Sequence, residues 1–321
     1  MSYLPKILTI IGLLMLIQGC APSSYVIKNP TPSNIHFQES NNKSSESIAI
    51  IDARSDNEKL FSYGVLKAGL ILEGKEFDPI AYLKAQTQRE LEARGLSAVI
   101  KNTGNIQVEI NKFYMRNHRT NGYTPFITLT MLSAELKSAT SEERIVVYIK
   151  RGKVPVWSFN EIVQPTLNEP LDLLVKEFAA KLNMIIYGSK ISDNEVKSLV
   201  AKIESQPAAY ETYLYVYQLG FGNNKTAIPA LVKLTNSESE YVRLAAISSL
   251  GILKATDQSK SLQDIAQNSD SWQDRSMAFK AIGDIGNPEA IAFLKSTLNK
   301  LNTKTAKEDQ WAKEVVELYL Q

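Results

Sequence analysis

The chain has 321 residues, of which 44% are hydrophobic and 22% charged, and its formal net charge is +2. These fractions are typical of folded globular domains and exclude a disordered or fibrous chain. A charge this close to zero argues against a nucleic-acid partner. The length is sufficient for two ordinary domains.

The N-terminal segment combines a short, positively charged start with an apolar stretch that ends at a cysteine. Lys6 precedes the apolar run Ile7–Ile17, whose length of about eleven residues lies in the range of signal peptides. A helix of that length rises only ~16 Å, whereas a bilayer core is ~30 Å thick. Cys20, the only cysteine, follows directly between Gly19 and Ala21, and it has no intramolecular disulfide partner.

This arrangement resembles the lipobox of bacterial lipoproteins. The resemblance implies that a signal peptide, residues 1–19, is removed and that Cys20 receives a covalent lipid such as palmitate. In Gram-negative lipoproteins an aspartate after the cysteine commonly retains the protein in the inner membrane. Ala21 therefore implies the periplasmic face of the outer membrane. Gln18 departs from the small or apolar residue that is usual there. The alternatives are a buried N-terminal helix and an ordinary secretory signal with an incidental cysteine.

Residues 20–47 are rich in Pro, Ser and Asn and show no persistent apolar period. Such a composition cannot bury enough surface to offset the entropy of ordering it. We therefore expect a lipidated, flexible tether with an r.m.s. span of roughly 30 Å. Val26 and Ile27 are the residues that could dock on the folded body.

Residues 48–188 are predicted to form an α+β domain. Ile48–Ile51 is an apolar run typical of a buried strand. Ile106, Val108 and Ile110 alternate with polar residues, which is the pattern of a half-buried strand. The further candidate strands cover residues 96–100, 126–136, 145–149 and 156–163.

Two long helices are predicted in the same domain. The first begins with Asp78 as N-cap and Pro79 at its first position. The second is capped by Asn168 and ends at Gly188, because glycine tolerates the left-handed conformation that stops a helix.

With the early Asp52-Ala53-Arg54, this order of elements resembles the YajG-like group of small bacterial lipoproteins. The function of that group is poorly defined, so the resemblance implies an envelope location and no particular chemistry. Asp52 and Asp56 could form a carboxylate pair, but an ion pair with Arg54 at a strand end is favoured.

Residues 189–321 contain an internal repeat. Tyr213–Gly220, Leu244–Gly251 and Ser276–Gly283 align without gaps, and a leucine follows each glycine by eleven residues, as Leu231, Leu262 and Leu294. Self-similarity with a period of about 30 residues indicates a repeat architecture. Each unit is predicted to supply two helices, with the glycine where the second helix stops.

Leu244-Ala245-Ala246-Ile247 after Val242-Arg243, and the run Ala281–Ile291, resemble short HEAT repeats. The resemblance implies an all-α solenoid of about three repeats, closed by a capping helix near 306–320. Asp274 departs from the valine that Val242 supplies in the previous unit, and Arg275 keeps the arginine of Arg243. Chromophore lyases of phycobilisomes use similar repeats, but a lipid-anchored periplasmic location argues against that function.

HEAT-like solenoids present an extended surface that suits recognition of another protein. The predicted partner-binding residues lie on the second helices and are Tyr213, Tyr217, Arg243, Ser248, Gln273 and Lys280. Two alternatives stay open: the tyrosines pack the solenoid against the α+β domain, and Arg243 bonds to neighbouring turns.

No catalytic or metal site is predicted. The chain has two histidines, His36 and His118, and neither has a second ligand within sequence reach. We therefore predict a periplasm-facing outer-membrane lipoprotein that binds a protein and needs no cofactor besides the lipid on Cys20. The alternative is an enzyme or small-ligand-binding protein that uses the α+β domain.

Overall fold

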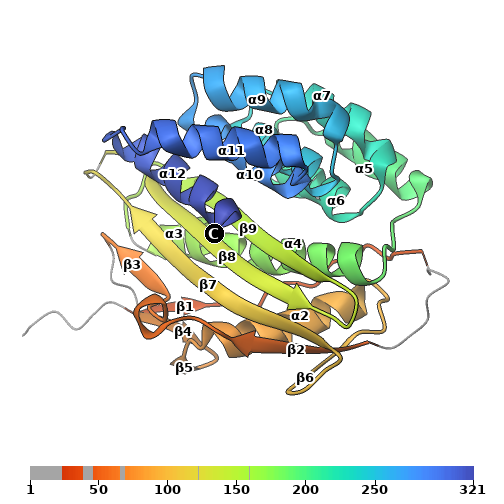
Figure 1. Ribbon diagram of the computed structural model, residues 1–321. Helices are drawn as coiled ribbons and strands as arrows, with labels where there is room; N and C mark the ends of the chain where they lie inside the picture. The colour runs from red at the N-terminus through yellow and green to blue at the C-terminus, as the bar shows by residue number, and fades with distance from the viewer. Residues whose placement is uncertain (1–23, 39–45, 66–68, 122, 159) are drawn as a thin grey trace, which may run out of the picture.

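The computed structural model describes residues 24–38, 46–65, 69–121, 123–158 and 160–321. The predicted signal peptide and Cys20 lie outside these ranges. Within them the chain forms the predicted α+β region followed by paired helices, and helices cover both faces of a central sheet (Figure 1). No helix in the described ranges is long and apolar enough to cross a membrane.

The central sheet has six strands, in the order β6-β2-β7-β8-β9, with β3 also pairing with β7. Three long antiparallel strands dominate it, namely β7 (Ile106–His118), β8 (Phe126–Lys137) and β9 (Glu142–Lys153). The shorter β2 (Ser47–Asp52), β3 (Ser62–Gly64) and β6 (Val99–Lys101) pair in parallel. At the end of β2, Arg54 forms the expected ion pair with Asp52, with Nε 2.8 Å from Oδ1.

One face of this sheet is covered by α2 (Pro79–Ala93) and α4 (Glu169–Ile186). Asp78 caps α2 as predicted, because its Oδ1 accepts hydrogen bonds from the backbone N–H groups of Ile80 and Ala81. Gly188, with a φ of +62°, follows the end of α4. The burial of α4 is extensive, and its inner residues join the common hydrophobic core.

The strand predicted at 156–163 is wrong. Residues 154–158 form a loop, and the chain then enters α3 (Asn160–Val163) and the π-helical turn η2 (Gln164–Asn168), which leads into α4. Pro155 has no N–H to donate to a strand ladder, so β9 ends before it. Asn168 consequently lies inside a helical segment and does not cap α4. Its Oδ1 instead accepts a hydrogen bond from the backbone N–H of Lys28 at 3.0 Å.

The expectation of a flexible tether fails for residues 24–38. Ser24–Ile27 forms strand β1, which pairs in parallel with β4 (Gly69–Leu72), and β4 pairs with β5 (Lys75–Glu76). Tyr25, Ile27 and Ile35 are buried in the core. The alternation of Tyr25 and Ile27 with exposed neighbours supplies enough apolar burial to hold a segment whose average composition is polar.

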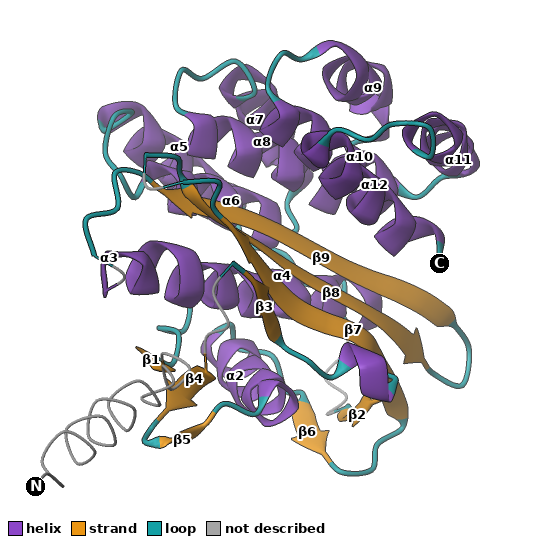
Figure 2. Cartoon of the chain, turned by 90° about the vertical axis from the view of Figure 1, so that its left-hand side faces the viewer, coloured by secondary structure: helices purple, strands orange, loops and turns teal. Residues whose placement is uncertain are grey.

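Four helix pairs follow in the described chain. They are α5 (Asp193–Ser205) with α6 (Thr212–Phe221), α7 (Ile228–Leu234) with α8 (Glu240–Ile252), α9 (Ser259–Asn268) with α10 (Trp272–Ile285), and α11 (Pro288–Leu301) with α12 (Lys307–Leu320). The second helices lie against the sheet, and the first helices form the outer layer (Figures 1 and 2). The sheet is thus enclosed between α2 and α4 on one face and the repeats on the other.

The recurring glycines have a different role from the one expected. Gly220, Gly251 and Gly283 lie inside the second helices, before their ends. A Cβ at these positions would lie less than 3.0 Å from Ser249, Ala281 and Tyr319, respectively, on the next second helix. Glycine is therefore required by the close crossing of neighbouring repeats.

Candidate functional site

The second helices carry the residues predicted to bind a partner, and most of these side chains are buried against the sheet. Tyr213 and Tyr217 are 2% and 3% exposed, and Ser248 and Lys280 are fully buried. The prediction that Ser248 and Lys280 are exposed and available to a partner is therefore wrong, and the burial of the two tyrosines agrees with the packing alternative left open for them. The sequence repeat identifies the second helices, but it does not show whether they contact another protein or another part of the same chain. In this structure they pack against the chain's own α+β region.

Tyr213 belongs to a cluster around the buried Arg151 of β9. The guanidinium lies 4.3 Å from the centre of the Tyr213 ring and 3.9 Å from that of Tyr241, which is a cation–π arrangement. Tyr213 donates a hydrogen bond to Glu169 of α4 at 2.8 Å, and Glu169 is also ion-paired with Arg151. Burial raises the pKa of Tyr241 to about 12. The tyrosines therefore pack the solenoid on the α+β region, as the open alternative predicted.

Lys280 is part of a buried, charge-balanced cluster. Its Nζ lies 2.8 Å from Glu177 Oε1 and 2.7 Å from Asp284 Oδ2, while Lys181 Nζ lies 2.8 Å and 2.6 Å from the same two carboxylates. Tyr319 donates a further hydrogen bond to Asp284. Burial alone would raise the pKa of Asp284, but the two lysines hold that pKa below its usual value. The cluster joins α4 to α10 and α12.

The edge strand β9 is covered by side chains of the second helix α8 and of α4. The backbone N–H of Gly152 donates to the Tyr241 hydroxyl at 3.0 Å, and that hydroxyl donates to the Gly152 carbonyl at 2.7 Å. Lys181 donates to the carbonyl of Val146. An exposed edge strand is a template for pairing with another chain. These side chains satisfy three of its backbone groups, and so they obstruct this edge against pairing with another strand.

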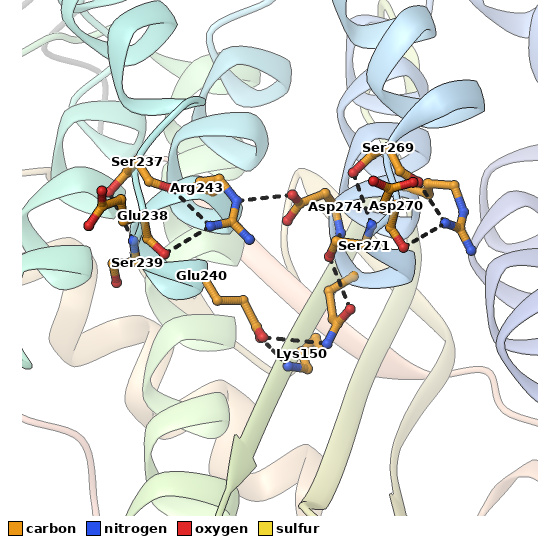
Figure 3. A network of polar contacts seen from close by, with 12 residues as sticks. Lys150, Ser237, Glu238, Ser239, Glu240, Arg243, Ser269, Asp270, Ser271 and Asp274 are labelled. Atoms are coloured by element: carbon orange, nitrogen blue, oxygen red, sulfur yellow. Dashed lines mark hydrogen bonds and ion pairs between the residues drawn. The ribbon is translucent and has the colours of Figure 1, made fainter.

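Polar side chains gather where the second helices α8 and α10 begin (Figure 3). Arg243 Nη1 donates to the carbonyls of Ser237 and Glu238 at 2.9 and 3.1 Å. One repeat later, Arg275 Nη1 donates to the carbonyls of Ser269 and Asp270 at 2.7 and 3.3 Å. The two arginines therefore fix the turns between first and second helices, which confirms the structural alternative for Arg243.

A second set of contacts joins this surface to the sheet. Lys150 of β9, which is 5% exposed, is ion-paired with Glu240 at the start of α8. Burial lowers the pKa of Lys150, and Glu240 opposes that shift. Gln273, half-buried, donates to Glu240 at 3.4 Å. Gln273 is therefore held in the network and is only partly available to a partner.

A groove lies between two successive repeats beside Arg243. Its volume is about 450 Å³, and it is lined by Thr235, Asn236, Ser237, Arg243, Ile247, Asp264, Ile265, Asn268, Ser269 and Asp274. Asp274 is 7% exposed and accepts a hydrogen bond from Arg243 through Oδ2 at 3.0 Å. Its other oxygen, Oδ1, is buried and has no hydrogen-bond partner among the residues that the structure describes.

Residues 196–278 match the family model for HEAT repeats. The match begins in α5 and ends in α10, so it contains the whole groove and both arginines. HEAT repeats are generally protein-interaction and scaffold modules, which is consistent with the predicted scaffold role. No curated protein is detectably similar to the chain in sequence.

The HEAT repeats and the sheet also enclose a larger cleft, at the opposite end of β9. Its volume is about 610 Å³, and it lies between the β8–β9 hairpin and the C-terminal ends of α4, α8 and α10. Lys181 and Asp284 reach it from the buried cluster, and Arg144, Lys254 and Ile252 line it. In the described ranges no group of histidine, cysteine, aspartate and glutamate side chains could hold a metal ion.

Proposed function

We propose that this protein is a lipoprotein of the outer membrane, anchored through Cys20 with its folded part facing the periplasm, and that it binds a protein partner at the groove between its HEAT repeats. The observation that carries the binding proposal is Asp274. Its carboxylate lines the groove, one of its oxygens has no hydrogen-bond partner among the described residues, and a cationic group of a partner in the groove would offset the cost of burying that charge.

The position of the groove supports this proposal. The inner face of the repeats is covered by the sheet, so a partner must approach from the outer layer or from the turns between helices. Asn236 and Asp264 are exposed there, and the half-buried Ile265 supplies apolar surface within the same groove. The site thus combines a small apolar area with polar groups that can fix the orientation of a ligand.

The charge of the groove indicates what kind of segment binds. Glu238, Asp264 and Asp270 are exposed around it, and no ion pair is found for them within the described residues. Arg243 and Arg275 direct their N–H groups to backbone carbonyls. The rim is therefore acidic, and we propose that the partner inserts a lysine or arginine into the groove beside Asp274.

The sequence supports the anchor. Cys20 follows a short apolar run and has small neighbours. By resemblance to Gram-negative lipoproteins, Ala21 in place of an aspartate implies the outer membrane. The resemblance of residues 48–188 to YajG-like lipoproteins also points to the cell envelope.

Site-specific crosslinking in cells tests the binding site. A photo-crosslinking amino acid at Asn236 in the groove should capture a discrete partner, and the same amino acid at Lys295, exposed on the outer helix α11, should not. Capture at Lys295 with none at Asn236 would place the partner elsewhere.

Small-ligand binding is the second candidate, and the 610 Å³ cleft is the observation that favours it. Ligand sites occur preferentially at domain interfaces, and the ion-paired Lys181 and Asp284 lie at this one. If Lys254→Glu abolishes function in cells while groove variants retain it, the cleft is the working site.

A further inference from the structure

Two loops at one end of the sheet carry fully exposed aromatic side chains. Tyr123, between β7 and β8, is 95% exposed, and Trp157, after β9, is 85% exposed. Val154 in the second loop is 54% exposed. Large apolar side chains grouped at a surface usually mark an interaction site.

The two loops are held in place by polar contacts. Arg119 donates from Nε to the carbonyl of Thr124 at 3.2 Å and from Nη2 to the carbonyl of Val156 at 3.4 Å. The backbone N–H of Trp157 donates to Glu161 at 3.4 Å. The aromatic side chains therefore project from a braced pair of loops.

The start of the described chain lies at the same end. Strand β1, where that chain begins, contacts α3, which follows Trp157 after a short connection, and both lie on the left-hand side of the molecule in Figure 1. Val26 on β1 is 66% exposed. Cys20 precedes Ser24 by four residues, a stretch that spans at most ~14 Å when fully extended.

We propose that this end of the molecule, with Val26, Tyr123, Val154 and Trp157, rests on the bilayer that holds the lipid of Cys20. The inference rests on the proposed anchor. A lipid within ~14 Å of Ser24 keeps this end at the membrane. Tryptophan and tyrosine favour the membrane–water interface, because their rings are apolar at one side and polar at the other.

The charge near this surface suits a bilayer with anionic headgroups. Lys28, exposed beside β1, and Lys153, at the end of β9, form no ion pair with any described residue. Basic residues near a membrane are attracted by its negative surface potential. Aromatic and electrostatic contacts thus add to the lipid chain, and they fix the orientation of the folded body, which the lipid alone leaves free.

Fluorescence quenching tests the docking on the full, lipidated protein in vesicles of phosphatidylethanolamine and phosphatidylglycerol. Replacing part of the phosphatidylglycerol with its brominated form should quench tryptophan emission. Trp157→Phe should lose the bromolipid-dependent quenching. The matched control Trp272→Phe should keep it, because Trp272 packs on Trp311 within the repeats.

Equal quenching in the wild type and in Trp157→Phe would overturn the docking proposal. Intact-mass measurement of the same sample separates this failure from failure of the anchor. A lipidated Cys20 with Trp157 unquenched overturns the docking alone, whereas a Cys20 without lipid overturns the anchor and the docking together.

Discussion

Arg243 donates from Nε to Asp274 Oδ2 across 3.0 Å and thereby links the second helices of two successive HEAT repeats. The same arginine holds the turn before its own helix, so it bonds both within and between repeats. Arg275 repeats only the contact with the turn. This difference between two equivalent positions allows the contribution of the inter-repeat bond to be measured.

Arg243→Ala is expected to lower the free energy of unfolding by about 1–3 kcal/mol, because it removes three hydrogen bonds and leaves a buried carboxylate uncompensated. Arg275→Ala should cost less, since it loses only the bonds to its turn. Urea titration followed by circular dichroism measures both. Equal losses would mean that the bond to Asp274 contributes nothing.

Asp284→Asn should destabilise the protein by about 3–5 kcal/mol, because it leaves Lys181 and Lys280 buried without a full set of partners. It should also change the dependence of stability on pH. The folded pKa of Asp284 is depressed. The contribution of this carboxylate to the free energy of unfolding is therefore fully present above about pH 4, which is the pKa of an aspartate in the unfolded chain. It is lost as the pH falls through the lower pKa that Asp284 has in the folded protein.

The wild type should accordingly lose stability below about pH 4 more steeply than Asp284→Asn. Denaturant titrations at a series of acidic pH values compare the two proteins. Parallel curves would show that the carboxylate of Asp284 does not stabilise the junction of α4 with the repeats.

Gly251→Ala separates two effects of opposite sign. Alanine favours a helix interior over glycine by about 1 kcal/mol, but a Cβ here would overlap Ala281 of the next helix. Overpacking costs about 1–3 kcal/mol, so a net loss of stability is expected. The control is Gly69→Ala, where the nearest atom would lie at 3.8 Å. A higher melting temperature for Gly251→Ala would exclude the close crossing.

The repeat was predictable from the sequence because its cause is local and recurrent. Each glycine permits one close crossing, and Leu231, Leu262 and Leu294 are buried at equivalent positions of the first helices. The cap of α2 and the alternating strand β7 were predictable for the same reason, whereas the cap predicted at Asn168 was wrong. Asp78 and the series from Ile106 to Ile110 act through their immediate neighbours.

The burial of Lys280 could not be predicted in this way. Its partner Glu177 lies about a hundred residues earlier in the sequence, on the far side of the β9 edge, and no local pattern reports that contact. Ile27 was one of the two residues named as able to dock, but the strand around it and the burial of Tyr25 were missed, because composition was averaged over a polar segment. Asp274 was visible as a departure from valine, but only the fold shows that one of its oxygens is buried beside a groove.

The anchor has a direct chemical test. We expect the mature protein to begin at Cys20 and to carry lipid on it, and Cys20→Ala should leave an uncut precursor. Mass spectrometry of the purified protein measures both. Ala21→Asp should shift the protein toward the inner membrane in fractionation, whereas a mature chain with an unmodified Cys20 would contradict the assignment.

Charge reversal in the groove tests the central claim most directly. Partner capture by the tagged, full-length protein should fall at least tenfold for Asp264→Lys combined with Asp270→Lys, since a loss of about 1.4 kcal/mol of binding free energy already gives that factor. The control is Glu204→Lys with Glu289→Lys, two exposed carboxylates on other helices of the repeats, and capture should be unchanged. Equal capture by both double variants, with melting temperatures like that of the wild type, would contradict binding at the groove.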